Sequence, residues 1–272
     1  MTYRDILVLV DDKLESTSLI TAAVHQAQRS QAMLIGAFIK PAFIYPYMGS
    51  EFGTYLPGDV IQTMMDDHAA TVLKASQKAK QQFEAHATKA KLDHEWRELE
   101  GSNSDALIAL ARCTDLLVYP KTGIAEIGYS AADITLAVGG PVLLVQRSEQ
   151  STLPAKALVA WNASREAANA LRGAWPMLKG LEVSVVCVSD KEQSLQSLED
   201  HIKRHDLVPS MNLVNGRDAD AGEIVQEQTK ALNCNLVVMG LYGRTRLQEL
   251  ILGGASRRLL HADDPTLLLV AH

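Results

Sequence analysis

The chain has 272 residues, enough for one large domain or two of ordinary size, and 47% of them are hydrophobic, so that two cores can be filled. A formal net charge of −6 argues against nucleic acid as the main partner. The three cysteines lie far apart and fit neither a disulfide framework nor a metal site, which indicates a reducing compartment. The first residues carry charges and no apolar run reaches membrane-spanning length, so we expect a cytoplasmic protein without a membrane partner.

The first predicted strand lies at residues 6–12, an apolar run that ends in Asp11 and Asp12. A second strand is expected to end near Ile39. It is followed by residues 41–60, which are rich in aromatic residues, proline and glycine, and then by a long helix that runs to about Lys91. We interpret residues 41–60 either as a surface loop that packs on its own domain or as a lid or interface segment.

The second half of the chain repeats motifs of the first half in the same order. "ILVLVDD" at residues 6–12 matches "ALVAWNA" at residues 157–163, "DLLVYPKTG" matches "NLVVMGLYG", and "PVLLV" matches "PTLLLV". Repetition in the same order indicates a tandem duplication. We therefore predict two domains, residues 1–146 and residues 156–272, joined by the polar hinge "QRSEQSTLPAK".

Within the second half, short apolar runs alternate with helical patterns. The runs lie at residues 157–161, 183–188, 210–214, 236–239 and 266–270. In "SREAANALRGAWPMLKG" the apolar residues have helical spacing, with Ser164 as the N-cap and Gly180 as the stop signal. Apolar strands that alternate with helices predict two Rossmann-like α/β domains, each a five-stranded, mainly parallel sheet between helices, with the direction of the last strand left open. Such sheets bind ligands at the carboxyl ends of their strands.

A glycine-rich segment, "VVMGLYGRTRLQELILGGASRRLL" at residues 237–260, joins a predicted strand to a predicted helix. Its glycines read G-x2-G-x9-G-G and are Gly240, Gly243, Gly253 and Gly254. Glycines let an anion approach backbone amides closely, and a helix N-terminus favours negative charge. Arg244 and Arg257 add charged donors. The segment therefore favours phosphate binding, and the alternative is that the glycines only shape a loop and the arginines are solvated.

These motifs resemble the universal stress protein family, in its tandem two-domain form, over nearly the whole chain. Nucleotide-binding members of that family use G-x2-G-x9-G-[ST]. Gly240, Gly243 and Gly253 match this pattern, whereas Gly254 stands at the hydroxyl position, two residues before Ser256. The resemblance implies two adenine nucleotide alpha hydrolase-like domains, with ATP, alone or with Mg²⁺, bound in the second.

The resemblance also implies roles for residues at the strand ends. In such proteins an aspartate after the first strand contacts the adenosine, and backbone groups at the end of the second strand contact the adenine edge. The nucleotide-binding set implied for the second domain is Asn162, Val188, Met239, Gly240, Gly243, Arg244, Gly253, Gly254 and Ser256. Asp11 and Ile39 are the matching residues of a second candidate site in the first domain.

The first domain departs from the phosphate pattern. Pro120 replaces the first glycine and removes an amide donor, and the stretch after Gly123 is too short to match the phosphate loop. We therefore expect a degenerate first domain that holds no triphosphate.

Other candidate sites are weaker. No Walker motif and no general base is evident, so we assign no catalytic residue and expect at most a slow ATPase. His201 and His205 lie four residues apart, as a metal pair would, but no third ligand is evident and a solvated helix face is favoured. Metal binding is left open.

The function that the resemblance implies is adenine-nucleotide binding in a stress response, as a sensor or regulator with an unidentified regulatory protein as partner. An interaction scaffold without nucleotide and a slow nucleotide hydrolase or transferase are the alternatives. The last strands, "PVLLVQ" and "PTLLLVAH", are expected to meet across a pseudo-twofold axis in an intramolecular pseudo-dimer, and a homodimer is also open.

Overall fold

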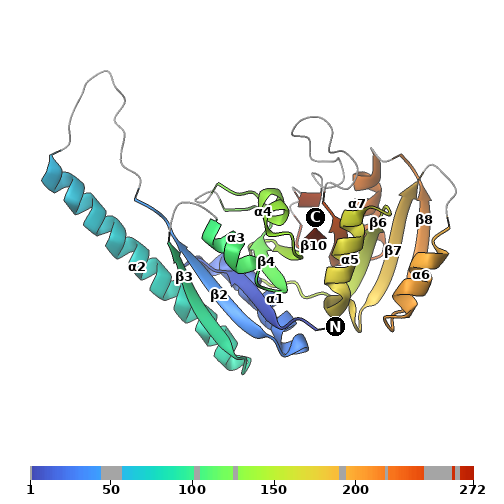
Figure 1. Ribbon diagram of the computed structural model, residues 1–272, viewed down its shortest axis with the longest axis horizontal. Helices are drawn as coiled ribbons and strands as arrows, with labels where there is room; N and C mark the ends of the chain where they lie inside the picture. Colours follow the sequence, from blue (N-terminus) through green and yellow to red (C-terminus); the bar gives the residue numbers. More distant parts are fainter. Residues whose placement is uncertain are drawn as a thin grey trace, which may run out of the picture.

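The computed structural model describes residues 2–43, 57–100, 105–124, 128–189, 194–217, 220–241, 259–260 and 264–272. Its strands form one ten-stranded sheet with helices on both faces (Figure 1). The part of the chain before the hinge contributes β1 (Asp5–Leu9), β2 (Met33–Lys40), β3 (His94–Glu100), β4 (Leu116–Pro120) and β5 (Val142–Val145). The part after the hinge contributes β6 (Lys156–Trp161), β7 (Glu182–Ser189), β8 (Ser210–Asn215), β9 (Leu236–Gly240) and β10 (Leu267–Ala271).

The strand order is β3-β2-β1-β4-β5-β10-β9-β6-β7-β8, so each half of the chain fills one half of the sheet. All pairs within a half are parallel. The only antiparallel pair among the described strands is β5 with β10, where the halves meet. The predicted pairing of the last strands is thus confirmed. Each last strand runs parallel to its own half, which settles the direction that the sequence left open.

The register of the sheet repeats between the halves. Leu117 lies opposite Val142 in the first half as Val237 lies opposite Leu268 in the second, so Leu143 corresponds to Leu269. At the central pair, Leu269 lies opposite Leu143 itself. The β5–β10 pairing is therefore symmetric about these two leucines. The predicted domain limits, residues 1–146 and 156–272, stay a prediction, because the sheet is continuous across them.

Helices cover both faces in the same way in each half. One face is covered by α1 (Thr17–Ser30), α2 (Gly58–Lys89), α5 (Arg165–Leu178) and α6 (Gln196–Lys203). The other face is covered by α3 (Asp105–Ala111), α4 (Ala131–Val138) and α7 (Ala221–Ala231). Successive strand residues point to opposite faces, so the buried strand residues divide between two cores that each span both halves. The predicted α/β fold with a mainly parallel sheet between helices is confirmed.

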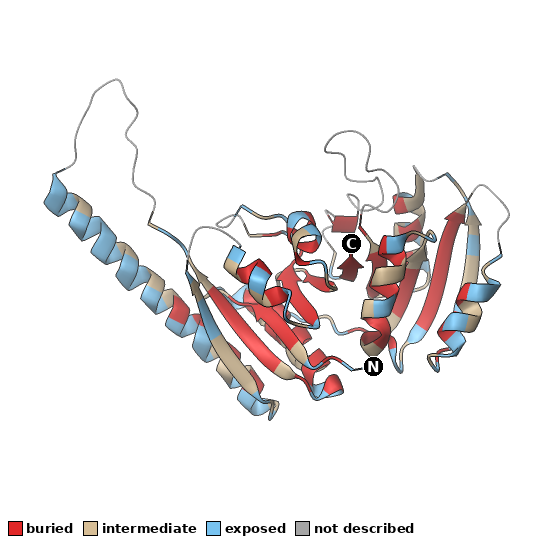
Figure 2. Cartoon of the chain, viewed as in Figure 1, coloured by how far each residue is buried: buried red, intermediate tan, exposed pale blue. Residues whose placement is uncertain are grey.

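Two helices show how local sequence sets the packing. Ser164 caps α5 as predicted, because its Oγ accepts a hydrogen bond from the Ala167 amide at 3.1 Å. The long helix α2 ends at Lys89, close to the predicted end, and its Phe83 is buried against β2. Gly36 of β2 makes that contact possible, because a Cβ there would lie 2.9 Å from the ring of Phe83. Much of the rest of α2 is exposed (Figure 2).

Candidate functional site

The carboxyl edge of the second half brings together the described part of the predicted nucleotide set. Ala160 lies opposite Met239, and Trp161 lies opposite Cys187. Continuing this register sets Asn162 beside Val188 and sets Gly240 beside Trp161, one residue before Asn162. The remaining predicted residues, Gly243, Arg244, Gly253, Gly254 and Ser256, lie outside the described residues, so the phosphate loop stays a sequence prediction.

Asn162 has a structural role at this edge. Its side-chain oxygen accepts a hydrogen bond from the Ser164 amide at 3.1 Å, which shapes the turn that leads from β6 into α5. An asparagine or aspartate suits such a turn, because its short side chain bonds to the backbone two residues on. The turn thus accounts for the residue without a ligand.

Gly240 also has a packing role. A Cβ at this position would lie 2.4 Å from the backbone nitrogen of Ala167 and 2.5 Å from the carbonyl carbon of Glu166. The glycine is therefore required for β9 to end against the first turn of α5. The buried carboxylate of Glu166 lies there, paired with Arg165 at 2.9 Å. Burial by itself would raise the pKa of Glu166, but hydrogen bonds from its own backbone and from Arg165 outweigh it and lower the pKa.

The carboxyl edge of the first half carries a partly open cavity of about 160 Å³. Asp11 and Ile39, the predicted second candidate site, both line it. The remaining walls come from β1, β2, α2 and the segments after β4 and β5, and they are mostly apolar. They comprise Leu9, Val10, Asp12, Lys13, Phe38, Pro41, Thr71, Val72, Ala75, Ile124 and Arg147.

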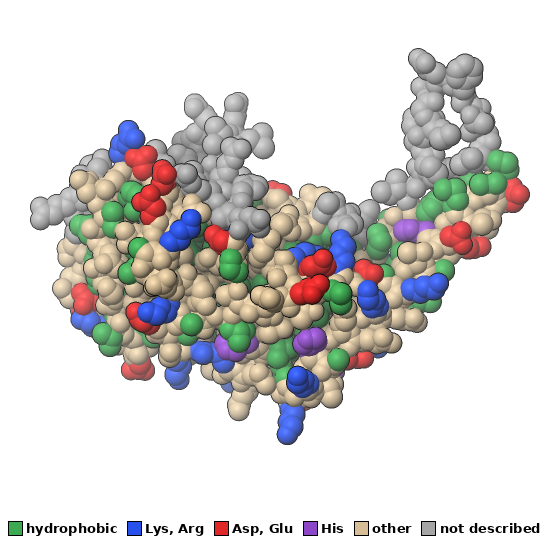
Figure 3. Space-filling view, turned by 180° about the vertical axis from the view of Figure 1, so that it is seen from behind, with side chains coloured by type: hydrophobic (Ala, Val, Ile, Leu, Met, Phe, Trp, Pro, Cys, Tyr) green, Lys and Arg blue, Asp and Glu red, His purple; other side chains and the backbone are tan. Residues whose placement is uncertain are grey.

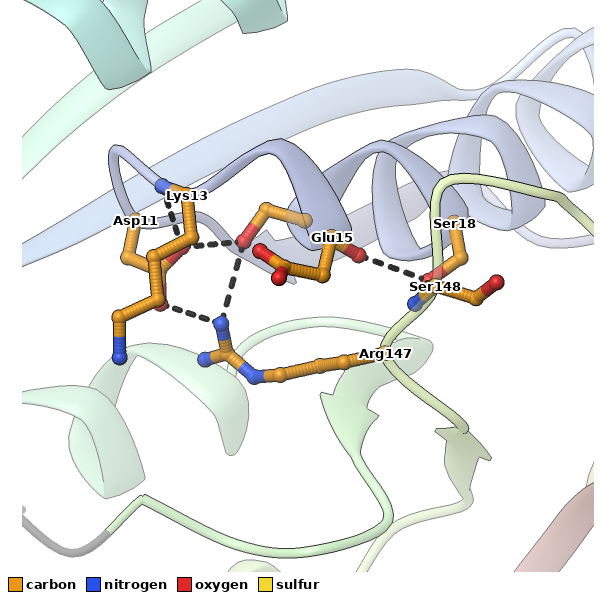
Figure 4. Close-up of polar contacts among 7 residues, drawn as sticks. Asp11, Lys13, Glu15, Ser18, Arg147 and Ser148 are labelled. Carbon is orange, nitrogen blue, oxygen red and sulfur yellow. Dashed lines mark hydrogen bonds and ion pairs between the residues drawn. The ribbon is translucent and has the colours of Figure 1, made fainter.

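A polar network closes one end of this cavity (Figure 4). Nη1 of Arg147, two residues beyond β5, donates to the carboxylate of Asp11 and to Oγ of Ser16. The same carboxylate accepts hydrogen bonds from the Ser16 hydroxyl at 2.5 Å and from the Lys13 amide at 3.0 Å. Burial by itself would raise the pKa of Asp11, but the Ser16 hydrogen bond and the charge of Arg147 outweigh it and lower the pKa. The lowered pKa favours the ionised form of Asp11, and both of its carboxylate oxygens accept hydrogen bonds from the protein.

The two edges differ in what they offer an anion. Pro120 stands in the first half where Gly240 stands in the second, since Val118 pairs with β1 as Val238 pairs with β6. A proline has no amide to donate. Asp11 already accepts three side-chain or backbone donors from the protein. These features agree with a first edge that holds no nucleoside triphosphate, which stays a prediction.

Sequence reasoning missed two cations at the first edge. Arg147 was assigned to the polar hinge, although a basic residue two positions beyond a buried strand is a signal for the carboxyl edge. Lys121, directly after β4, has a side chain that is only 1% exposed and pairs with Asp264 of the second half at 3.4 Å. Its burial could not be inferred from the sequence, because its partner lies across the β5–β10 pair.

The expected solvated face is confirmed for His201, which is exposed, whereas His205 is half-buried. The ring of His205 stacks on the buried indole of Trp175, with ring centroids 3.9 Å apart, and the His201 ring lies edge-on to both. Helix α6 packs on α5 through this cluster. Within the described ranges, no group of three or more histidine, cysteine, aspartate or glutamate side chains is placed to hold a metal ion.

Two general properties of the molecule bear on its partners. On the described part of the face in Figure 3, lysine and arginine side chains are interspersed with aspartate and glutamate. Among the described residues, no helix combines the length and apolar character needed to cross a lipid bilayer.

Comparisons with known proteins place the fold. No family model matches the chain, and no curated protein matches it. A crystal structure of a universal stress protein from Archaeoglobus fulgidus DSM 4304 matches 98% of this chain and 97% of its own, with a TM-score of 0.70 and 16% identity. A functionally unknown protein from Pseudomonas aeruginosa PAO1 matches 99% of this chain and 92% of its own, with a TM-score of 0.55 and 14% identity. The chain therefore has the fold of a universal stress protein over nearly its whole length, and the resemblance seen in the sequence is confirmed at the level of the fold.

Proposed function

We propose that this protein is a tandem universal stress protein that binds ATP at the carboxyl edge of its second half and acts as a cytoplasmic sensor or regulator in a stress response. The observation that carries the proposal is the register that sets Asn162, Val188 and Gly240 at one edge of the sheet. Ligands of parallel sheets bind at this edge. The glycine-rich segment that resembles the family's phosphate motif follows β9 directly.

In this proposal the two parts of the ligand contact different residues. Asn162, the backbone near Val188 and Met239 contact the nucleoside. The amides of Gly243, Gly253 and Gly254, with Arg244 and Ser256, contact the phosphates, with Mg²⁺ as an accompanying ion. The first half, residues 1–146, serves as the other member of an intramolecular pseudo-dimer with residues 156–272, and an unidentified regulatory protein reads the state of the pair.

A second candidate function is an interaction scaffold without nucleotide. The observation that favours it is that both Asn162 and Gly240 have packing roles of their own. Their presence at the second edge is then explained by the turn into α5 and by the approach of α5 to β9. The two functions differ in one measurable property, which is ATP affinity.

Calorimetric titration of the full chain with ATP tests the proposal, together with mass spectrometry of small molecules released from the purified protein. We expect Gly243→Val to lower ATP affinity at least about tenfold, because a branched side chain fills the space of phosphate oxygens. The control is Gly58→Val at the start of α2, where a Cβ meets nothing within 4 Å. Wild-type protein that binds no ATP, or a folded Gly243→Val protein with unchanged affinity, would favour the scaffold.

A further inference from the structure

The walls of the first-half cavity are suited to a small apolar body. The apolar lining comes from Phe38 and Ile39 of β2, from Val72 and Ala75 of α2, and from Ile124. Phe38 belongs to the same core as Val72 and Ala75, and Ile39 belongs to the core of the other face with Ile124. The volume of about 160 Å³ is close to that of an apolar cavity of about 150 Å³ that holds one benzene ring. A single ring or a short hydrocarbon chain fills such a space, whereas a nucleoside triphosphate is several times larger.

At the polar end of the cavity, one edge of the Arg147 guanidinium group makes no hydrogen bond to the described residues. Both protein acceptors of Arg147, the Asp11 carboxylate and the Ser16 hydroxyl, are bound by the same terminal nitrogen, Nη1. Within the described part of the chain, Nε and Nη2 donate to no protein acceptor. Figure 4 shows the ends of the Arg147 and Lys13 side chains on the same side of Asp11, and both residues line the cavity. An arginine edge formed by Nε and Nη2 binds a carboxylate through two parallel hydrogen bonds.

Because the charges in the cavity lining cancel, an anion needs the specific contact with Arg147 to bind there. Asp11 and Asp12 offset Lys13 and Arg147, so the cavity has no net charge that would attract an anion by itself. A ligand is therefore selected by the fork of Arg147 at one end and by its fit to the apolar walls at the other. Asp11 holds Arg147 in place for this role.

We propose that the first-half cavity binds a small carboxylic acid with a single ring or a short hydrocarbon body. The carboxylate lies on Nε and Nη2 of Arg147, and the apolar body lies between Phe38 and Val72. This site is separate from the proposed ATP site, which lies at the carboxyl edge of the second half, and it stands whether or not that site binds ATP.

Fluorine NMR on the full chain tests the site with 4-fluorobenzoate as the probe and 4-fluorobenzamide as its uncharged counterpart. We expect the benzoate to bind and the amide to bind about tenfold more weakly, since the amide lacks the charge-assisted fork. Arg147→Gln is expected to reduce the difference between the two probes to about twofold or less. Excess ATP is expected not to displace the benzoate.

Filling the cavity supplies a matched pair of variants. Val72→Trp places an indole in the cavity and is expected to abolish binding of both probes. Leu73→Trp makes the same change on the next residue of α2, whose side chain is 57% exposed and does not line the cavity, and it is expected to bind as the wild type does. Ala75→Leu is a second cavity-filling variant, and thermal melting shows which variants are folded.

Four results would overturn the proposal. They are no binding of 4-fluorobenzoate to the wild type, equal affinity for the amide, unchanged binding in folded Val72→Trp and Ala75→Leu proteins, and displacement of the benzoate by ATP. The last result would make the cavity a nucleotide site. Loss of ATP binding by the Gly243→Val protein with intact benzoate binding would show that the two sites are independent.

Discussion

At the scale of single residues, Gly240 occupies a position where glycine is favoured for two separate reasons. The phosphate pattern needs a glycine there for its amide, and the first turn of α5 needs a glycine there for space. The second demand holds with or without a ligand. The strength of the packing demand can be measured in the free energy of unfolding.

We expect Gly240→Ala to destabilise the protein by about 1–3 kcal/mol, because the added methyl group overlaps the backbone of Glu166 and Ala167. Urea unfolding of the full chain measures the change. Gly140→Ala is the control, since the nearest atom to its Cβ is a methyl carbon of Val138 at 3.9 Å. Equal stability of the two variants would show that the close approach of α5 is relieved without cost.

The pairing of Asp11 with Arg147 makes part of the stability depend on pH. The pKa of Asp11 is lowered in the folded chain, so the pair contributes stability above the ordinary carboxyl pKa and loses it as the pH falls through the lowered value. We expect Arg147→Gln to cost about 1–2 kcal/mol near neutral pH and progressively less below about pH 4. Urea unfolding at several pH values measures this.

The control for that series is Arg97→Gln, which removes a surface pair with Glu95 in which the arginine side chain is 55% exposed. Exposed pairs contribute little, and we expect a cost below about 0.5 kcal/mol at every pH. A pH-independent cost in Arg147→Gln would mean that the residue acts by packing and not by its charge.

At the scale of elements, the contact between α5 and the end of α6 includes a titratable ring, since His205 stacks on Trp175. Burial lowers the pKa of His205, and the neighbouring His201 lowers it further, against a smaller opposing effect of Asp206. A histidine whose pKa is lowered by folding contributes stability above its ordinary pKa and loses it as the pH falls. Protonation of His205 is therefore expected to weaken the packing of α6 on α5 before the sheet and the other helices lose structure.

We expect the fluorescence of Trp175 and the melting temperature of the wild type to fall as the pH drops through about 6.5 and below. His205→Phe keeps a flat ring on the indole and removes the titrating group, so its acid response should be flatter. His201→Gln should move the response to higher pH, relative to the wild type, by removing the neighbouring positive charge. Identical acid profiles for all three proteins would contradict this account.

At the scale of the whole molecule, the β5–β10 pair makes each half a partner for the other. Residues 156–272 alone would keep β9 beside the fully buried strand β10 but would leave its other edge without β5. We expect this fragment to dimerise through residues 267–271, with Leu269 opposite Leu269, and residues 1–146 to self-associate. Sedimentation of the fragments measures this, and Leu269→Arg should make the first fragment monomeric. Two monomeric fragments without the substitution would contradict the model.

Much of the fold could be predicted from the sequence because the two copies support each other. "ILVLVDD" and "ALVAWNA" are short alone, but their shared position before a helical pattern identifies a strand in both halves. The N-cap at Ser164 followed from local chemistry for the same reason. Burial by tertiary contacts has no such local signal, which is why the stacking of His205 on Trp175 was missed.

The candidate sites were less predictable. Asp11 and Ile39 are implied by the resemblance, and the fold brings both into the lining of one cavity. Arg147 was not identified, because its role depends on a partner 136 residues away in the chain. Asn162 follows β6 and Gly240 ends β9, as the apolar runs predict. Their packing roles depend on the position of α5, which no spacing in the sequence gives.

The central position of the β5–β10 pair also makes the junction between the two halves the most protected part of the sheet. Both strands are buried along their whole length, whereas β3 and β8 at the outer margins are partly solvated (Figure 2). Amide hydrogens exchange slowly where opening requires the loss of many buried contacts. We therefore expect the slowest native-state exchange at Leu143 and Leu269 and the fastest strand exchange in β3 and β8. Loss of structure then begins at the two ends of the sheet and reaches the junction of the halves last.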